Sequence, residues 1–250
     1  MKTQLITRRR ALIAGAAGVG GLILPRFGKD LPPTYGNILR MGDTLTYAAH
    51  RTLLPNQSLV REYSRSQITS FPATGTTNPG AIGRPLSDEY RQVQGSGFTG
   101  WRLSVEGQVA RPQAFTLADL KQLPARTQIT RHTCEEGWSA IGEWTGVPVS
   151  QVLDAAGILP TARYVVFYSF DDWIDCIDLF DALHPQTILA YGMNGKDLPI
   201  PHGAPLRLRV ERQMGYKSMK YLHHIVVKDE FDDGGDKGSI QNGWAWYTGI

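Results

Sequence analysis

The chain has 250 residues, of which 42% are hydrophobic and 20% charged, an ordinary globular composition that argues against a disordered body. Its 26 lysines and arginines against 23 aspartates and glutamates give a net charge of +3, too small to indicate a nucleic-acid-binding surface. Two cysteines, Cys134 and Cys176, are too few for a disulfide framework and lack the spacing of a structural zinc site.

The N-terminal stretch has the features of an export signal. Arg8, Arg9 and Arg10 precede an apolar run of about 14 residues, which is short for a bilayer span and typical of a signal peptide. A polar residue, two arginines and then apolar residues fit the twin-arginine pattern. We expect residues 1–27 to be a twin-arginine signal and the folded protein to be periplasmic. No A-x-A cleavage site follows the run, so the sequence leaves two outcomes open: the signal is cleaved, or it stays attached as a membrane tether.

The first predicted elements lie on either side of a change in composition. Residues 28–97 are rich in proline and glycine and predict an irregular arm, with a helix within 37–54 and a short strand within 57–68. Alternation of apolar and polar residues then predicts strands over 100–109 and 126–134. A helix is expected between them over 116–124, with Thr116 as its N-cap.

The second half of the chain continues this mixture. Helical spacing predicts a helix over 148–158, and a buried strand is expected over 163–170. Residues 173–195 read as a strand, a short helix and an apolar run into a turn, and two more strands are expected over 204–212 and 220–231. Because this order is neither a βαβ repeat nor an all-β meander, we predict one α+β domain with mixed sheets and peripheral helices. This domain spans 28–250, with its core at 98–230 and a C-terminal tail at 231–250.

Cys134 ends a predicted strand and is flanked by Arg131, His132, Glu135 and Glu136. A free cysteine is most often a small buried apolar side chain, but charged flanks at a strand end favour the rim of a cleft. The thiol could also serve as a nucleophile paired with a distant histidine. A third interpretation is a thiolate ligand of a soft or high-valent metal, with most other ligands supplied by a cofactor.

Four motifs in order around Cys134 carry a family resemblance. They are "TRHTCEEGWSAIGEWTGVP" from residue 130, "LAYGMNGKDLP" from 189, "PHGAPLR" from 201 and "GYKSMK" from 215. Together they resemble the sulfite-oxidase-type molybdopterin-dependent oxidoreductases, over about residues 59–227, and especially the bacterial catalytic subunits exported by the twin-arginine route. The resemblance implies a sulfite-oxidase-like fold and the cofactors molybdenum and molybdopterin.

The resemblance also implies site residues. Cys134 matches the thiolate ligand of molybdenum, and Arg61 is expected beside it as a second catalytic residue. His202 and Arg207 match the residues that hold the pterin and its phosphate, although these basic residues could instead lie on a solvated strand face. The implied cofactor contacts are Arg61, Glu62, Tyr63, Ser64, Cys134, Ser169, His202, Arg207, Ser218, Met219 and Lys220. Trp138, Trp144 and Trp173 are expected to pack around the edge of the cofactor.

One departure from the family bears on the substrate. Sulfite oxidases carry arginines shortly after the ligand cysteine, whereas this chain has Glu135 and Glu136, which would repel an anion such as sulfite. We expect transfer of an oxygen atom or two electrons to or from a small molecule, in a direction that the residues leave open. The alternatives are a redox-inert molybdopterin-binding module and a hydrolase with Cys134 as its nucleophile.

The expected reaction needs a partner that exchanges electrons with the protein. The chain has no CxxCH haem motif, so electrons are expected to pass through a separate cytochrome or membrane haem protein. That partner, or an uncleaved signal, would associate the protein with a membrane.

Overall fold

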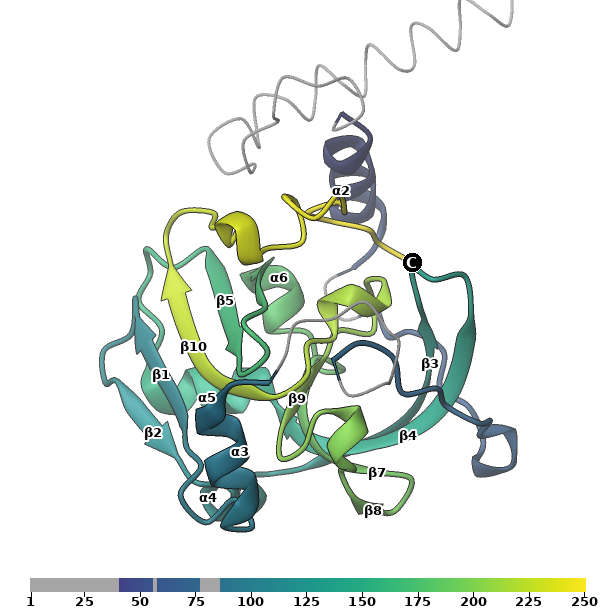
Figure 1. Cartoon of the computed structure of the whole chain (residues 1–250). Coiled ribbons are helices and arrows are strands. Elements are labelled where there is room, and N and C mark those ends of the chain that lie inside the picture. Colours follow the sequence, from purple (N-terminus) through teal and green to yellow (C-terminus); the bar gives the residue numbers. More distant parts are fainter. Residues whose placement is uncertain (1–40, 56–57, 77–85) are drawn as a thin grey trace, which may run out of the picture.

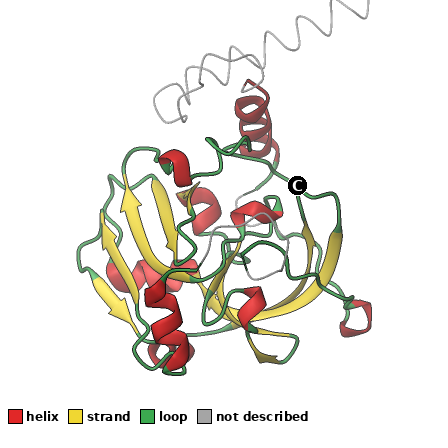
Figure 2. Ribbon diagram, in the orientation of Figure 1, coloured by secondary structure: helices red, strands yellow, loops and turns green. Residues whose placement is uncertain are grey.

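The computed structural model describes residues 41–55, 58–76 and 86–250. Two five-stranded sheets form the body, and most helices lie at its periphery (Figures 1 and 2). The predicted signal at 1–27 lies outside the described residues. Within them, every helix is too short or too polar to cross a bilayer.

The first sheet joins strands that are far apart in the sequence. Its order is β2 (Gln113–Phe115), β1 (Leu103–Gly107), β10 (Leu222–Lys228), β5 (Tyr164–Ser169) and β6 (Ile174–Asp178). The β1–β10 pair is parallel and the other three pairs are antiparallel, so this sheet is mixed. Parallel pairing brings β1 beside β10 (Figure 1).

The second sheet carries the strand that immediately precedes Cys134. Its order is β3 (Arg126–Thr133), β4 (Ser139–Pro148), β7 (Ile188–Met193) and β8 (Lys196–Asp197), and β9 (Arg207–Arg209) also pairs with β7. All pairs are antiparallel. Since Thr133 lies opposite Ser139, the loop with Cys134 is a tight connection between two long strands.

The helices are short and cap the sheets. The α-helices are α2 (Met41–Leu53), α3 (Asp88–Gly95), α4 (Leu117–Gln122), α5 (Val149–Ala156) and α6 (Leu179–Ala182), and the 3₁₀ turns are η2 (Arg65–Gln67), η3 (Ile200–His202), η4 (Gly215–Lys217) and η5 (Gly235–Lys237). The predicted cap of α4 is present, because the Asp119 N–H donates to Thr116 Oγ1 over 3.0 Å. Helix α5 buries one apolar face and ends at Gly157, whose φ is 71°.

One apolar core receives side chains from both sheets. Leu103 and Ile225 of the first sheet and Leu189 and Leu208 of the second are all buried in it. Burial of each such side chain stabilises the fold by about 1.5–3 kcal/mol. The shared core favours treating residues 28–250 as a single domain, which stays a prediction.

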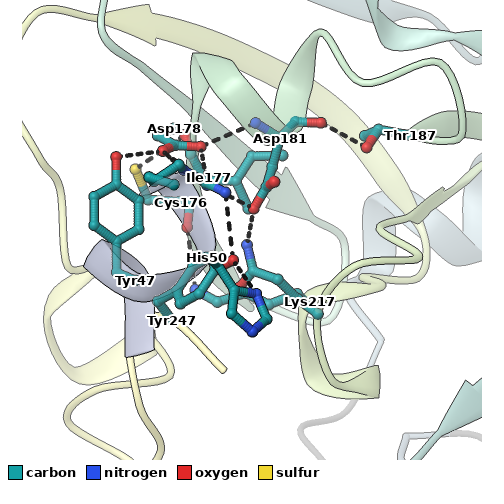
Figure 3. Close-up of polar contacts among 11 residues, drawn as sticks. Tyr47, His50, Cys176, Ile177, Asp178, Asp181, Thr187, Lys217 and Tyr247 are labelled. Atoms are coloured by element: carbon teal, nitrogen blue, oxygen red, sulfur yellow. Dashed lines mark hydrogen bonds and ion pairs between the residues drawn. The ribbon is translucent and has the colours of Figure 1, made fainter. Parts of the chain in front are cut away.

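Helix α2 is attached to this body by a buried ion-pair cluster, the α2 clamp, made of Tyr47, Arg51, Asp178, Asp181 and Tyr247 (Figure 3). The Arg51 guanidinium lies 2.9 Å from Asp178 Oδ1 and 3.1 Å from Asp181 Oδ2. The Tyr47 hydroxyl donates to Asp178 over 2.7 Å. The clamp therefore joins the helix to β6, α6 and the C-terminal tail.

Several predicted elements differ from the structure. The strand within 57–68 was wrong: the described part, 58–68, holds only η2, since its run of polar residues has no alternating apolar face. The strand over 204–212 is reduced to β9. The irregular arm contains the helix α3, which the prediction lacked, besides α2.

Strand β4 was missed because its glycines resemble turn signals. Gly146 lies where β4 passes β7 so closely that a Cβ would be 2.1 Å from the Leu189 carbonyl oxygen. Only glycine fits at this irregular step of the strand pairing. Gly146 is thus a requirement of the sheet.

Candidate active site

A cavity of about 650 Å³ lies where the Cys134 loop meets loops from both halves of the chain. Its lining comes from residues 71–76, 132–138, 171–173, 201–207, 215–220 and 242–244. Six of the predicted site residues line it together: Cys134, His202, Arg207, Ser218, Met219 and Lys220. The loops that follow β3 and flank β9 therefore converge on one site.

Cys134 lines the cavity and is held in place by hydrogen bonds within its loop. The Cys134 N–H donates to the Trp138 carbonyl over 2.9 Å, and the Gly137 N–H donates back to the Cys134 carbonyl over 3.2 Å. The thiol donates to Glu135 Oε2 over 3.5 Å, and burial, with the carboxylates of Glu135 and Glu136, raises its pKa to about 12. A thiol nucleophile would need the opposite, a nearby cation that stabilises the thiolate.

The lining of the same cavity includes two cations, Arg207 and Lys220, that form no ion pair with a carboxylate of the described residues. Arg207 is 4% exposed and donates only to the carbonyls of His202 and Ser218, over 3.0 and 2.8 Å. Its Nε has no hydrogen-bond partner. Lys220 Nζ donates to the carbonyls of Thr74 and Pro201, over 2.5 and 3.1 Å.

Burial, with the neighbouring positive charges, destabilises the charged forms of both side chains. The pKa of Arg207 falls to about 9 and that of Lys220 to about 8, in each case chiefly because the group is buried. Among the described residues, no carboxylate forms an ion pair with either one. A buried charge such as that of Arg207 is normally paired, so the part of the cavity lined by Arg207 and Lys220 fits an anionic ligand such as a phosphate.

His202 lies beside these cations as the last residue of η3. Burial and the charges of Arg207 and Lys220 lower its pKa to about 4, so the imidazole is neutral at pH 7 and offers one donor and one acceptor. The next residue must be glycine, because its φ is 104° and a Cβ there would lie 2.7 Å from Lys220 Cβ. Gly203 thus lets the two basic loops touch.

His132 is a site residue that the sequence analysis did not assign. It lines the cavity two residues before Cys134, and Arg209 Nη1 lies 2.7 Å from its Nδ1. Since a guanidinium can only donate, Nδ1 accepts and the proton is on Nε2. Burial, then the charges of Arg209 and Arg207, lower the pKa of His132 to about 2, so it cannot act as a base toward Cys134.

The predicted contacts at residues 61–64 are not part of this cavity. Tyr63 N–H donates to the Ile129 carbonyl over 2.8 Å, and Glu62 pairs with Arg126, so the segment runs along the outer edge of β3. Arg61 packs its guanidinium 5.0 Å from the Tyr63 ring, and Ser64 caps η2. None of the four residues is in the cavity lining, and their roles as cofactor contacts, and that of Arg61 as a catalytic residue, stay predictions.

Residues 71–76 cover the cavity instead. The Thr69 N–H donates to the Ile141 carbonyl over 3.0 Å and fixes the start of this segment on β4. The Phe71 ring then lies 5.2 Å from the His132 ring and 5.6 Å from the His202 ring. A proline-rich arm carries no periodicity from which this register could be predicted.

The predicted contact Ser169 and the buried Lys217 support the lining without being part of it. Ser169 is not in the lining; its hydroxyl bonds to the Trp173 carbonyl and to Asp171, which does line the cavity. Lys217 is buried and paired with Asp175, and it supports the loop that carries Ser218.

The tryptophans divide into two groups. Trp138 and Trp173 line the cavity, as does Trp244 of the tail, which was not predicted. Trp144 lies beneath the site, where its ring is 4.9 Å from the Arg207 guanidinium and 4.5 Å from that of Arg209.

A family model described as the oxidoreductase molybdopterin binding domain matches residues 91–235, more than half of the chain. The chain belongs to this family. It is therefore an oxidoreductase that uses the molybdenum–molybdopterin cofactor, and the predicted α+β class with mixed sheets is confirmed. Arg207 and Lys220, which are predicted to bind the cofactor, both line the cavity.

Curated relatives carry related names. The chain is 41% identical over 196 residues to the "Putative protein-methionine-sulfoxide reductase subunit YedZ1" of Azospira oryzae, covering 78% of this chain and 69% of the relative. It is 32% identical over 160 residues to the protein-methionine-sulfoxide reductase catalytic subunit MsrP of Xanthomonas campestris, covering 58% of this chain and 50% of that protein. The solved sulfane dehydrogenase SoxCD of Paracoccus pantotrophus aligns with 24% identity and a TM-score of 0.49, covering 52% of this chain and 38% of its own.

Arg207→Ala and Lys220→Ala should each lower the cofactor content of the purified protein. Each removes a charge-assisted contact worth about 1.5–3 kcal/mol, or roughly ten- to hundredfold in affinity. The measurement is molybdenum per protein, with a thermal melt to exclude unfolding. Lys121→Ala is the control, since Lys121 lies exposed on α4, pairs with the exposed Asp197 and is not in the cavity lining. Full molybdenum content in both variants would contradict the assignment of Arg207 and Lys220 to cofactor binding.

Proposed function

We propose that the protein is the catalytic subunit of a sulfoxide reductase that acts on methionine sulfoxide or a similar small sulfoxide. The observation that carries the proposal is one cavity lined by the buried Cys134 thiol and by two cations, the buried Arg207 and the half-buried Lys220, that form no ion pair with a carboxylate among the described residues. The names of the curated relatives support this substrate class.

Cys134 is the proposed protein ligand of molybdenum. A thiolate suits a soft or high-valent metal, and metal binding removes the thiol proton despite its raised pKa. The second cysteine, Cys176, is buried in β6 away from the lining. When bound, the cofactor supplies the oxygen-atom acceptor and the two electrons of each turnover.

The residues of the chain would then divide the remaining work. Arg207, Lys220 and the neutral His202 bind and orient the anionic cofactor, and residues 71–76 exclude water from one side of it. Sulfoxide reduction consumes two electrons and two protons and yields a thioether and water. Because the Cys134 thiol lies within hydrogen-bond distance of Glu135, that carboxylate borders the reacting position and favours a neutral sulfoxide over the sulfite anion.

The test uses the holoenzyme with a reduced viologen dye as electron donor. We expect methionine sulfoxide to oxidise the dye and sulfite to give no turnover in the opposite direction with an oxidised dye. Sulfite oxidation without sulfoxide reduction would contradict the proposal. Ester hydrolysis by cofactor-free protein would favour the thiol hydrolase, and bound cofactor without any turnover would favour the redox-inert module.

We also propose that the protein is exported by the twin-arginine route and exchanges electrons with a separate membrane haem protein. The support is the signal-like sequence at 1–27 and the absence of a CxxCH motif from the chain. Changing Arg8, Arg9 and Arg10 together to lysine tests the route, because lysine lacks the paired guanidinium geometry. Normal appearance of this triple variant in the periplasm would contradict the proposal.

A further inference from the structure

The C-terminal tail reaches the active-site cavity and contributes Asn242 and Trp244 to its lining. Two sets of contacts hold the tail in place. The Met214 N–H donates to the Thr248 carbonyl over 3.0 Å, and the Tyr216 hydroxyl donates to the Ala245 carbonyl over 2.8 Å. The tail is therefore fixed against the same loop that carries Ser218 and Lys220.

Trp244 belongs to a row of three aromatic side chains. Its ring centre lies 5.2 Å from that of Trp173 and 5.4 Å from that of Tyr216. All three residues line the cavity, and the two tryptophans are half-buried. We call Trp173, Tyr216 and Trp244 the aromatic wall.

The wall differs in chemistry from the part of the cavity lined by Arg207 and Lys220. It carries no positive charge, so it has nothing with which to hold a phosphate. Gly215, next to Tyr216, packs against the strand end that precedes Cys134, since a Cβ at Gly215 would lie 3.1 Å from the Thr133 carbonyl oxygen. The wall therefore lies on the side of the cavity where the thiol is, and an apolar ligand suits it.

Given the proposed reductase activity, on which this inference rests, we infer that Trp173 and Trp244 bind the apolar arm of the sulfoxide substrate. The ring faces can hold methylene or aryl groups and make sulfur–aromatic contacts worth about 0.3–1.5 kcal/mol. Trp244 comes from the tail, so the tail determines which sulfoxides bind well. The substrate class is a sulfoxide with one bulky apolar arm.

Two sulfoxides of different size test the inference on the holoenzyme. For methyl phenyl sulfoxide, Trp244→Ala should raise KM about tenfold, whereas dimethyl sulfoxide, which lacks the arm, should show a clearly smaller rise. Trp244→Phe should restore most of the preference for the aryl substrate. Gln241→Ala, an exposed tail residue outside the lining, should leave both KM values unchanged.

Two readouts other than turnover accompany the kinetics. Molybdenum per protein should stay at the wild-type level in Trp244→Ala, and methyl phenyl sulfone, which is not reduced, should quench the tryptophan fluorescence of wild type more than that of the variant. The inference would be overturned if Trp244→Ala had the same ratio of KM for methyl phenyl sulfoxide to KM for dimethyl sulfoxide as wild type, whether or not the variant lost molybdenum. If wild type reduces neither sulfoxide, the proposed function itself fails, and the two failures are thus distinguishable.

Discussion

Cys134→Ser should abolish all detectable sulfoxide reduction while leaving the fold intact. Serine has nearly the same size, and the loop around residue 134 is held by backbone hydrogen bonds that the substitution does not touch. A hydroxyl is a poor ligand for a soft or high-valent metal, so the metal would lose its protein ligand. The measurements are dye-coupled turnover, molybdenum per protein, the Mo(V) resonance signal and a thermal melt.

Cys176→Ser is a matched control from the same chain. Cys176 is 1% exposed, lies in β6 and contacts the Ile177 carbonyl, and it does not line the cavity. This variant should keep the turnover number of wild type even if its melting temperature falls. Wild-type turnover by Cys134→Ser with bound metal would show that another group holds the molybdenum.

The part of the site that the sequence predicted is the part encoded by short motifs. His202 and Arg207 lie five residues apart, and Ser218, Met219 and Lys220 follow one another, so each motif brings its own residues together. The motifs meet because they flank β9, which spans only three residues. Local sequence was therefore enough for these positions.

The rest of the site depends on contacts between distant segments. Trp244 reaches the cavity through contacts of the tail with Met214 and Tyr216, and His132 gains its role from Arg209 on another strand. Local patterning does not specify such pairings. His132 did have a signal, since it is two residues before Cys134 and strand alternation puts both side chains on one face.

The fold divides in the same way. Helices α4 and α5 were predicted because their capping residues and apolar spacing are local. The parallel pairing of β1 with β10 was not predicted, because it joins segments that are more than a hundred residues apart and leaves no mark on either one. Individual helices and strands were therefore easier to predict from the sequence than the way in which they pair and pack.

The α2 clamp is a second place where a single substitution should have a large effect. The Arg51 side chain is 4% exposed, and those of Asp178 and Asp181 are 9% and 0% exposed. Burial and the neighbouring Asp181 raise the pKa of Asp178, and the Arg51 guanidinium opposes that rise. Arg51 thus supplies positive charge that compensates the two buried carboxylates.

Arg51→Met should lower the free energy of unfolding by about 3–5 kcal/mol, because it leaves the buried carboxylates without their cation. Loss of the cation also removes the force that opposed the rise in the Asp178 pKa, so the folded variant binds a proton at a pH where the unfolded chain does not. The stability of Arg51→Met therefore falls as pH rises above the pKa that Asp178 has in the unfolded chain. The loss of stability relative to wild type becomes smaller as pH falls through the pKa that Asp178 has in the folded variant. Urea unfolding at several pH values, at equal molybdenum content, measures both effects.

The triple variant Arg51→Met, Asp178→Asn, Asp181→Asn separates the uncompensated charge from lost packing. It removes both carboxylates, so it should recover part of the stability that Arg51→Met loses and should lose the added pH dependence. Recovery is expected to be incomplete, since Arg51 also packs 4.0 Å from the Phe180 ring and Asp178 accepts from the Tyr47 hydroxyl. A triple variant as unstable as Arg51→Met at every pH would show that packing of the guanidinium, and not its charge, holds α2 to the domain.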